Sequence, residues 1–193
     1  MTLTPRPEVV DFLLSRRSRP AKTLSGPGPD RAAIETLLQA AARSPDHGKL
    51  EPWRFIVLEG AALARLSALT DRLGEARGDA PERREKDRIG FERAPVAVAV
   101  VASPKPSEKI PEVEQLYSAG AVCLALLNAA LASGWGANWL SGWMATDPDW
   151  LREGLSLAAH ESVAGFIHIG SETVVPPDRP RPEMTAIVTW ATD

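Results

Sequence analysis

The sequence contains few of the residues that support disulfide, metal or hydrolytic chemistry. Its 193 residues include one cysteine, Cys123, and three histidines. A single cysteine cannot form a disulfide within the chain, which is typical of a protein in the reducing cytoplasm. The patterns GxxxxGK[ST], HExxH, CxxC and GxSxG are all missing. If the protein is an enzyme, we therefore expect a bound cofactor to carry the reaction.

Membrane and nucleic-acid partners also lack support in the sequence. The chain does not open with a basic-then-apolar signal segment, and it contains no uninterrupted apolar run of membrane length. A net charge of −3 gives no electrostatic reason to expect nucleic acid as a partner. Hydrophobic residues make up 44% and charged residues 24%, which indicates a folded protein. The length predicts a single domain over residues 1–193.

The histidines give little support for a metal centre. His168 alternates with apolar residues in a predicted strand, so we expect a core or edge histidine with hydrogen-bond partners. His160 lies in a polar turn and is expected to be solvated. No metal site is therefore predicted.

Hydrophobic periodicity predicts helices and strands that alternate irregularly along the chain. The expected helices are Glu8–Arg17, Arg31–Arg43, Ala61–Leu73, Glu112–Ser133 and 148–155. The expected strands are Trp53–Glu59, Pro95–Ala102, Ser162–Ile169 and Thr185–Thr192, and Gly134–Gly142 is a short strand or loop. This order of elements predicts an α+β or mixed α/β domain.

Two segments have unusual composition. Residues 74–93 are the most charged part of the chain, and their charge pattern favours a solvated loop and helix face. A mobile flap over a site is the alternative. By contrast, the second half of helix Glu112–Ser133 is apolar on nearly every side. Since one sheet cannot cover all of that surface, we expect an interface with a second copy of the chain.

Three polar groups stand out from their surroundings: Arg16-Arg17-Ser18 at the end of the first helix, the turn Ser44–Lys49, and Asp178–Arg181 between prolines. Each has a simple structural alternative, since cations at a helix end are favoured by the helix dipole and basic arms are often solvated. Together, however, they place guanidinium groups in rigid or terminal positions that suit planar recognition of an anion.

Five segments, in order, resemble the flavin-dependent nitroreductases, most closely a small bacterial subgroup of NAD(P)H nitroreductases. They are LLSRRS, RSPDHGKLEPWRFIVLEG, EQLYSAGAVCLALLNAALASGWGANWLSG, GFIHIGS and RPRPEMTAIVTW. The resemblance implies an α+β nitroreductase-like fold with a central mixed or antiparallel sheet flanked by helices. It also implies an intertwined homodimer that binds FMN at the subunit interface.

The resemblance also implies roles for particular residues. Arg16 and Ser18 would hold the FMN phosphate and ribityl chain, and Arg17 would lie near the flavin ring. Arg43 and His47 would reach the site from the other subunit. Arg181, with Arg179 beside it, would contact the phosphate. The stretch Trp139, Leu140 and Ser141 would pass the flavin. The nicotinamide and substrate side would be formed by Ala129, Ala130, Leu131, Ala132, Ser133 and Gly134.

The expected activity is NAD(P)H-dependent reduction of a nitroaromatic, a quinone or a similar electron-poor small molecule by a ping-pong cycle, with no catalytic side chain assigned. One departure concerns the second motif, where Lys49 and Glu51 stand at positions that the family often fills with Asn and Gln. Two alternatives remain open. The protein could bind FMN as a store or sensor without turnover, or it could be a flavin-free interaction protein on the same scaffold.

Overall fold

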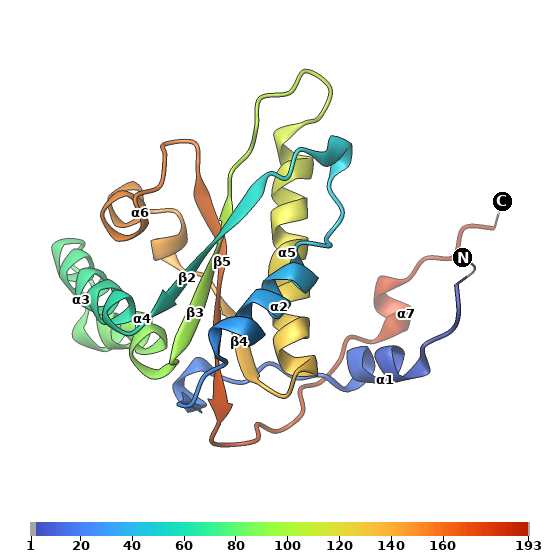
Figure 1. Ribbon diagram of the computed structural model, residues 1–193, viewed down its shortest axis with the longest axis horizontal. Coiled ribbons are helices and arrows are strands. Elements are labelled where there is room, and N and C mark those ends of the chain that lie inside the picture. The colour runs from blue at the N-terminus through green and yellow to red at the C-terminus, as the bar shows by residue number, and fades with distance from the viewer. Residues whose placement is uncertain (1–2, 193) are drawn as a thin grey trace.

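A single antiparallel sheet forms the centre of the protein. The computed structural model describes residues 3–192 and arranges five strands in the order β1-β5-β3-β2, with β4 also paired to β5 (Figure 1). Every pair within these residues is antiparallel. The strands are β1 Leu24–Ser25, β2 Trp53–Glu59, β3 Val96–Ala102, β4 Gly136–Leu140 and β5 Ser162–Glu172. The expected α+β fold is confirmed.

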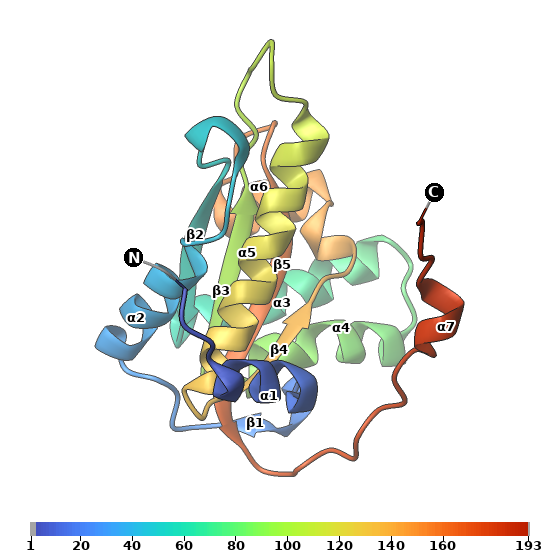
Figure 2. The ribbon, with the colours of Figure 1, turned by 90° about the vertical axis from the view of Figure 1, so that its right-hand side faces the viewer.

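Helices cover both faces of this sheet. One face carries α3, α4 and α6, and the other carries α2 and α5 (Figures 1 and 2). The helices are α1 Pro7–Ser15, α2 Arg31–Ala41, α3 Ala61–Ala76, α4 Pro81–Arg93, α5 Glu112–Ala132, α6 Pro148–Leu155 and α7 Met184–Ile187. Asp30 begins α2, because its carboxylate accepts a hydrogen bond from the amide of Ala33.

The central strand β3 is buried along its whole length, as its continuous apolar sequence predicts. Ala97 and Ala99 face the cluster beneath α3, α4 and α6, while Val98 and Val100 face the cluster beneath α2 and α5. Because the side chains of a strand alternate between faces, a run such as VAVAVVA supplies both cores at once.

Helix α5 packs against the sheet through one face only. Its buried residues include Val122, Cys123 and Leu126, whereas Tyr117 and Leu124 are exposed on the outer side. By length and composition alone this helix could cross a membrane, but here it forms part of the core beneath β3, β4 and β5. Apolar side chains therefore remain exposed on the outer side of α5, as expected for a helix with more apolar surface than one sheet can cover.

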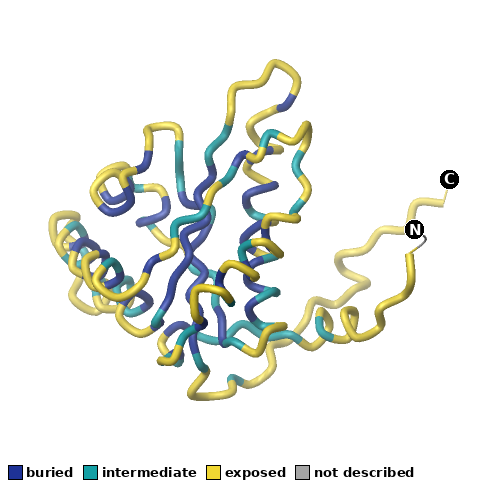
Figure 3. Tube along the Cα trace, in the orientation of Figure 1, coloured by how far each residue is buried: buried dark blue, intermediate teal, exposed yellow. Residues whose placement is uncertain are grey.

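The predicted final strand is wrong. Residues 185–192 contain most of the short helix α7 and irregular backbone, and they lie away from the sheet (Figures 1 and 3). Their β-branched and aromatic composition favours a strand, but composition does not provide a neighbouring strand for backbone hydrogen bonds. The first helix also ends earlier than predicted, at Ser15, because Arg16 has an extended ψ of 144°.

The charged segment 74–93 is folded as the end of α3, a short turn and helix α4. Gly90 and Phe91 at the end of α4 are buried against the sheet, while most charged side chains of the helix face solvent or α3. The predicted helix face is therefore present. A flap motion of this segment stays a prediction.

A tryptophan and a threonine join α6 to α3 inside the core. Trp150 is fully buried, stacks on Phe91 and meets the ring of Phe166 edge-on. Its indole Nε1 donates to Thr70 Oγ1 at 2.9 Å, and the hydroxyl of Thr70 donates to the carbonyl of Leu66 at 2.8 Å.

We expect Thr70→Val to reduce the free energy of unfolding by about 1–3 kcal/mol. The substitution nearly preserves volume but leaves the buried indole N–H of Trp150 without an acceptor. Urea unfolding would measure the loss. Thr36→Val is a suitable control, because Thr36 is exposed and its hydroxyl bonds only to the carbonyl one turn earlier. Equal effects of the two substitutions would contradict the prediction.

Candidate functional site

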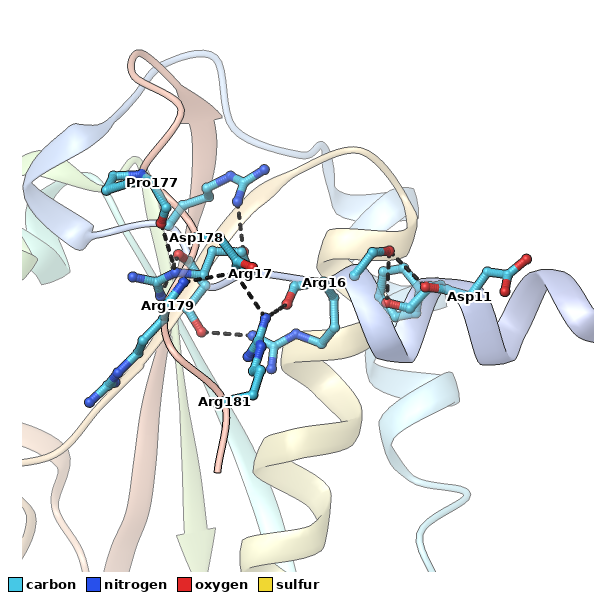
Figure 4. A network of polar contacts seen from close by, with 11 residues as sticks. Asp11, Arg16, Arg17, Pro177, Asp178, Arg179 and Arg181 are labelled. Carbon is cyan, nitrogen blue, oxygen red and sulfur yellow. Dashed lines mark hydrogen bonds and ion pairs between the residues drawn. The ribbon is translucent and has the colours of Figure 1, made fainter. Parts of the chain in front are cut away.

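Arginine side chains gather where the chain leaves α1. Residues 16–19 continue in an extended course beside β4, and the amide of Arg19 donates to the carbonyl of Ala137 at 2.8 Å. The segment after β5 crosses the same place. Arg17 Nε donates to the carbonyl of Pro177 at 3.4 Å, and Arg181 donates to the carbonyl of Arg16 at 3.4 Å (Figure 4). Two distant parts of the chain therefore bring four arginines together.

Arg16 lies at the centre of this cluster and is poorly neutralised. One of its terminal nitrogens donates to Ser18 Oγ at 2.8 Å, but its buried Nε has no partner within residues 3–192. Burial, followed by the positive charges of Arg181, Arg17 and Arg19, lowers the pKa of Arg16 below its usual range. A bound anion would relieve this repulsion and supply the missing acceptor.

The other arginines of the cluster are paired to different degrees. Arg19 forms an ion pair with Glu172, and Arg181 lies 3.2 Å from a carboxylate oxygen of Asp178. Arg17 donates only to carbonyl oxygens among the described residues. Of the four arginines in the cluster, Arg16 and Arg17 are therefore the two that have no carboxylate partner among residues 3–192, which leaves their charge available to an anion.

A hollow of about 280 Å³ opens beside these arginines. Its lining includes Arg16, Arg17, Phe12, Leu131, Gly134 and Trp135. Pockets that enclose a whole small molecule usually measure about 300–1,000 Å³. The hollow is therefore suited to one charged end of a larger ligand. Leu131 and Gly134 belong to the stretch predicted for the nicotinamide side, so the structure brings part of that stretch to the arginines.

Strand β4 leads from this hollow to the other predicted ligand segment. Gly136 lines the hollow, and Leu140 ends the strand about 13 Å further on, at about 3.3 Å per residue. Trp139 is half-buried and its Nε1 donates to the carbonyl of Ala164 at 3.3 Å. Ser141, just beyond the strand, is exposed. A ligand anchored by its charge at the arginines could extend along this strand.

The tryptophan also explains a glycine on the neighbouring strand. A Cβ atom on Gly165 would lie only 2.0 Å from Trp139 Nε1, so no larger residue leaves room for the indole. The orientation of Trp139 is thus set by the sheet itself.

Arg43 and His47 lie far from the arginine cluster within the chain. Both are exposed, and His47 Nδ1 lies 2.7 Å from Glu114 in the first turn of α5. Leu131, at the other end of α5, lines the hollow. Glu114, which His47 contacts, and Leu131 are separated by about 25 Å along α5, at 1.5 Å per residue. One chain therefore does not unite the two halves of the predicted site.

The turn that carries His47 has a defined shape. Asp46 accepts the amide of Leu50 at 2.6 Å, and the backbones of Lys49 and Glu51 adopt positive φ angles of 53° and 48°. These are the two positions at which the sequence departs from the usual Asn and Gln. Their side chains are exposed.

The two arginines of the C-terminal arm behave differently. Arg181 joins the cluster, whereas the side chain of Arg179 points away from Arg16 and only its amide bonds to Asp178 (Figure 4). Sequence reasoning missed Arg19, Phe12 and Glu172 as neighbours of the hollow. Arg19 directly follows the Arg-Arg-Ser motif, so its position was a usable signal, but the long-range contact with Glu172 had none.

Four larger hollows lie elsewhere among the described residues. Two of them, of about 320 and 410 Å³, are lined by both cations and anions. The other two are larger. One of about 740 Å³ runs between α3 and α4, where Arg88 pairs with Glu92 and the cations and anions balance. Another of about 800 Å³ lies beneath the 103–111 loop, where the Gln115 side chain is saturated by the backbone of Lys105. Neither concentrates unpaired charge of one sign, so the smaller arginine-lined hollow is the better candidate site.

An antiparallel sheet covered by helices on both faces, with an arginine-lined hollow beside β4, defines an α+β protein with a candidate anion site. The sequence model described as "Nitroreductase family" matches residues 13–171. The chain belongs to the nitroreductase family, as its motifs predict.

Curated relatives agree with this family. The Escherichia coli K12 protein named "Putative NAD(P)H nitroreductase YdjA" is 34% identical over 164 residues, covering 85% of this chain and 88% of the relative. A Haemophilus influenzae protein named "Putative NAD(P)H nitroreductase" is 34% identical over 166 residues, with the same shares covered.

Solved structures show the same fold at lower identity. A nitroreductase-like protein from Bacillus cereus has a TM-score of 0.79 at 21% identity, covering 98% of this chain and 99% of that one. A Desulfovibrio desulfuricans protein, described as "a putative nitroreductase in complex with FMN", has a TM-score of 0.72 at 22% identity, covering 98% of this chain and 100% of that one.

Proposed function

We propose that the protein is an oxidoreductase that binds FMN and uses NADH or NADPH as reductant. The observation that carries this proposal is the buried, unpartnered Nε of Arg16 within a group of four arginines. A phosphate monoester carries nearly two negative charges and offers several acceptor oxygens. Arg16, Ser18 and Arg181 suit the phosphate end of FMN. The names of the relatives, and the neighbour described with FMN, support this choice.

The protein would contribute positioning and electrostatics. Bound FMN would supply the redox chemistry, taking a hydride from NADH or NADPH and passing electrons to an electron-poor acceptor such as a nitroaromatic or a quinone in a ping-pong cycle. Arg17 would stabilise the negative charge that develops at the ring on reduction. Trp139, Leu140 and Ser141 would orient the ring, and the small residues of 129–134 would leave room for the nicotinamide.

We also propose a homodimer in which the site is shared. Helix α1 has no buried residue, and apolar side chains remain exposed on α1, α5 and the C-terminal arm, including Leu14, Tyr117, Leu124, Ile187 and Trp190. Both terminal segments extend away from the sheet (Figures 1 and 3). A second copy would cover this surface and bring Arg43 and His47 of one copy toward the arginines of the other.

Sedimentation of the full chain tests the dimer. We expect a mass of about twice 20.8 kDa at micromolar concentration. A monomer that still binds FMN tightly would contradict the shared site.

The environment of Cys123 fits a cytoplasmic location, which we propose as well. Burial raises the pKa of its thiol to about 12, so the thiol has little reactivity and no disulfide partner. A chain of this length needs no disulfide for stability.

An anaerobic titration of purified protein with NADH and NADPH, followed by flavin absorbance, tests the activity. The proposal expects a yellow protein that at least one nicotinamide bleaches, with the colour restored by a quinone. A yellow protein that neither nicotinamide bleaches would indicate a flavin store or sensor. A colourless preparation that stays colourless after FMN is added would indicate a flavin-free protein.

A further inference from the structure

The charged helix α4 is hydrogen-bonded through Asp87 to the segment that follows β4. Asp87 Oδ2 accepts a hydrogen bond from Trp143 Nε1 at 3.0 Å and another from Arg83 Nε at 2.8 Å. The side chain of Asp87 is only 11% exposed, although α4 is otherwise strongly solvated. Trp143 stands two residues after Ser141. The most charged part of the chain is therefore hydrogen-bonded to Trp143, just beyond the stretch 139–141 that we propose passes the flavin.

A second charged residue holds the same tryptophan from its face. The guanidinium carbon of Arg77, just after α3, lies 4.6 Å from the centre of the Trp143 ring. Arg77 is itself held by Asp79 at 3.5 Å and by Asp147 at 3.3 Å. Trp143 is thus fixed at its edge by Asp87 and at its face by Arg77, which determines both the position and the tilt of the ring.

The residues between β4 and Trp143 are also held by a backbone hydrogen bond, in which the amide of the buried Ala145 donates to the carbonyl of Gly142 at 3.0 Å. Ser141 and Gly142 are exposed, and Gly142 has a φ of 154°. On the other side of Trp143, Met144 and Ala145 are buried in the core. The path of Ser141 is therefore determined by the end of β4 before it and by Trp143 and the Gly142–Ala145 hydrogen bond after it.

Helix α4 also supports the end of β4 directly. A Cβ atom on Gly90 would lie 3.4 Å from the side chain of Leu140 and 3.0 Å from the ring of His168, so the helix packs closely there. The same helix thus contacts both ends of the exposed stretch Ser141–Gly142.

We propose that Asp87 and Trp143 are positioning residues that hold Ser141 and Gly142 in the conformation that accepts the flavin ring. This proposal rests on the proposed function. Segment 74–93 then acts as a rigid support, called the brace, in which Asp87 and Arg77 orient Trp143. A flap would need to break the Asp87–Trp143 hydrogen bond each time it opened.

The experiment compares FMN dissociation constants, measured by flavin fluorescence, for wild type, Asp87→Ala, Trp143→Phe and the double variant. Each single variant is expected to weaken binding about 5–10-fold, since each removes one hydrogen bond to a charged group. The double variant should bind no more weakly than either single variant, because both remove the same contact. Asp87→Asn keeps an acceptor and should restore binding to within about twofold of wild type.

Arg83→Ala is the matched control, since it removes an ion pair from Asp87 and leaves the contact with Trp143. It should bind FMN as wild type does. Hydrogen exchange of the flavin-free proteins adds an independent measurement, in which amides of residues 141–146 exchange faster in Asp87→Ala and Trp143→Phe than in Arg83→Ala. Should Asp87→Ala not fold, Trp143→Phe, which keeps the ring, carries the comparison.

The outcomes separate the two proposals. If the wild type binds FMN and both single variants bind equally well, the positioning role is overturned and the proposed function stands. If the effects of the two substitutions add, the residues act independently and the brace is overturned. If the wild type binds no FMN, the proposed function fails and this inference fails with it.

Discussion

Replacing Arg16 and Arg181 together with alanine is expected to weaken FMN binding by at least about 100-fold. Each charge-assisted hydrogen bond to a phosphate contributes about 1.5–3 kcal/mol, and about 1.4 kcal/mol corresponds to a factor of ten. Loss of two such bonds therefore predicts a factor of about 100 to 10,000. Fluorescence titration of flavin-free protein with FMN measures the change, and the purified variant should be colourless.

Removal of these arginines should not destabilise the fold. The two side chains repel each other, and this repulsion contributes to the lowered pKa of Arg16. The double variant is thus expected to unfold at the same urea concentration as wild type, or a higher one, when FMN is absent. A matched control is Arg31→Ala with Arg152→Ala, which removes two exposed arginines from other helices. Full flavin content in the Arg16/Arg181 variant would contradict the phosphate assignment.

The sequence predicted those parts of the fold that depend on residues close together in the chain, and not those that depend on long-range contacts. The strand at 96–102 and the apolar excess of α5 both follow from residues close together in the chain. The strand predicted at 185–192 failed, because a strand needs a partner and no local pattern supplies one. Apolar side chains in that segment, Trp190 among them, are exposed in the single chain, which is the pattern of a segment that packs on another copy.

The candidate site was predictable in composition but not in arrangement. The motif Arg16-Arg17-Ser18 marked the proposed anion site, and the resemblance added Arg181 from the other end of the chain. The contact between Arg19 and Glu172, and the clamp of Trp143 by Asp87, join residues more than 50 positions apart. Such contacts depend on how helices pack on the sheet, so neither spacing nor charge pattern could predict them.

His168 is a case in which the sequence predicted the place but not the state. The residue lies in the core, as its alternation in β5 predicts, with its ring 5.5 Å from that of Phe91. However, its Nδ1 has no hydrogen-bond partner within the described residues. Burial lowers the pKa of His168 to about 4, and a hydrogen bond with the backbone of Gly90 only partly opposes this shift.

The stability of the protein should consequently fall as the pH drops from 6.5 to 4. In the unfolded chain a histidine takes up a proton near pH 6.5, whereas the folded protein resists protonation of His168 until about pH 4. Protons therefore favour the unfolded state within this range. A difference of about 2.5 pKa values corresponds to about 3 kcal/mol of unfolding free energy lost across it.

Urea unfolding of wild type and His168→Leu at pH 7, 6, 5 and 4 isolates this contribution, because other groups titrate equally in both proteins. The difference in unfolding free energy between the two should shift by about 3 kcal/mol in favour of the variant between pH 7 and pH 4. His160→Gln removes an exposed histidine and should reproduce the wild-type slope. If His168→Leu loses stability on acidification as steeply as wild type, the pKa of His168 is the same in the folded and unfolded chains, and burial does not lower it. The protonated ring of His168, packed against Phe91 and Gly90, would then need a counter-charge that the described residues do not provide.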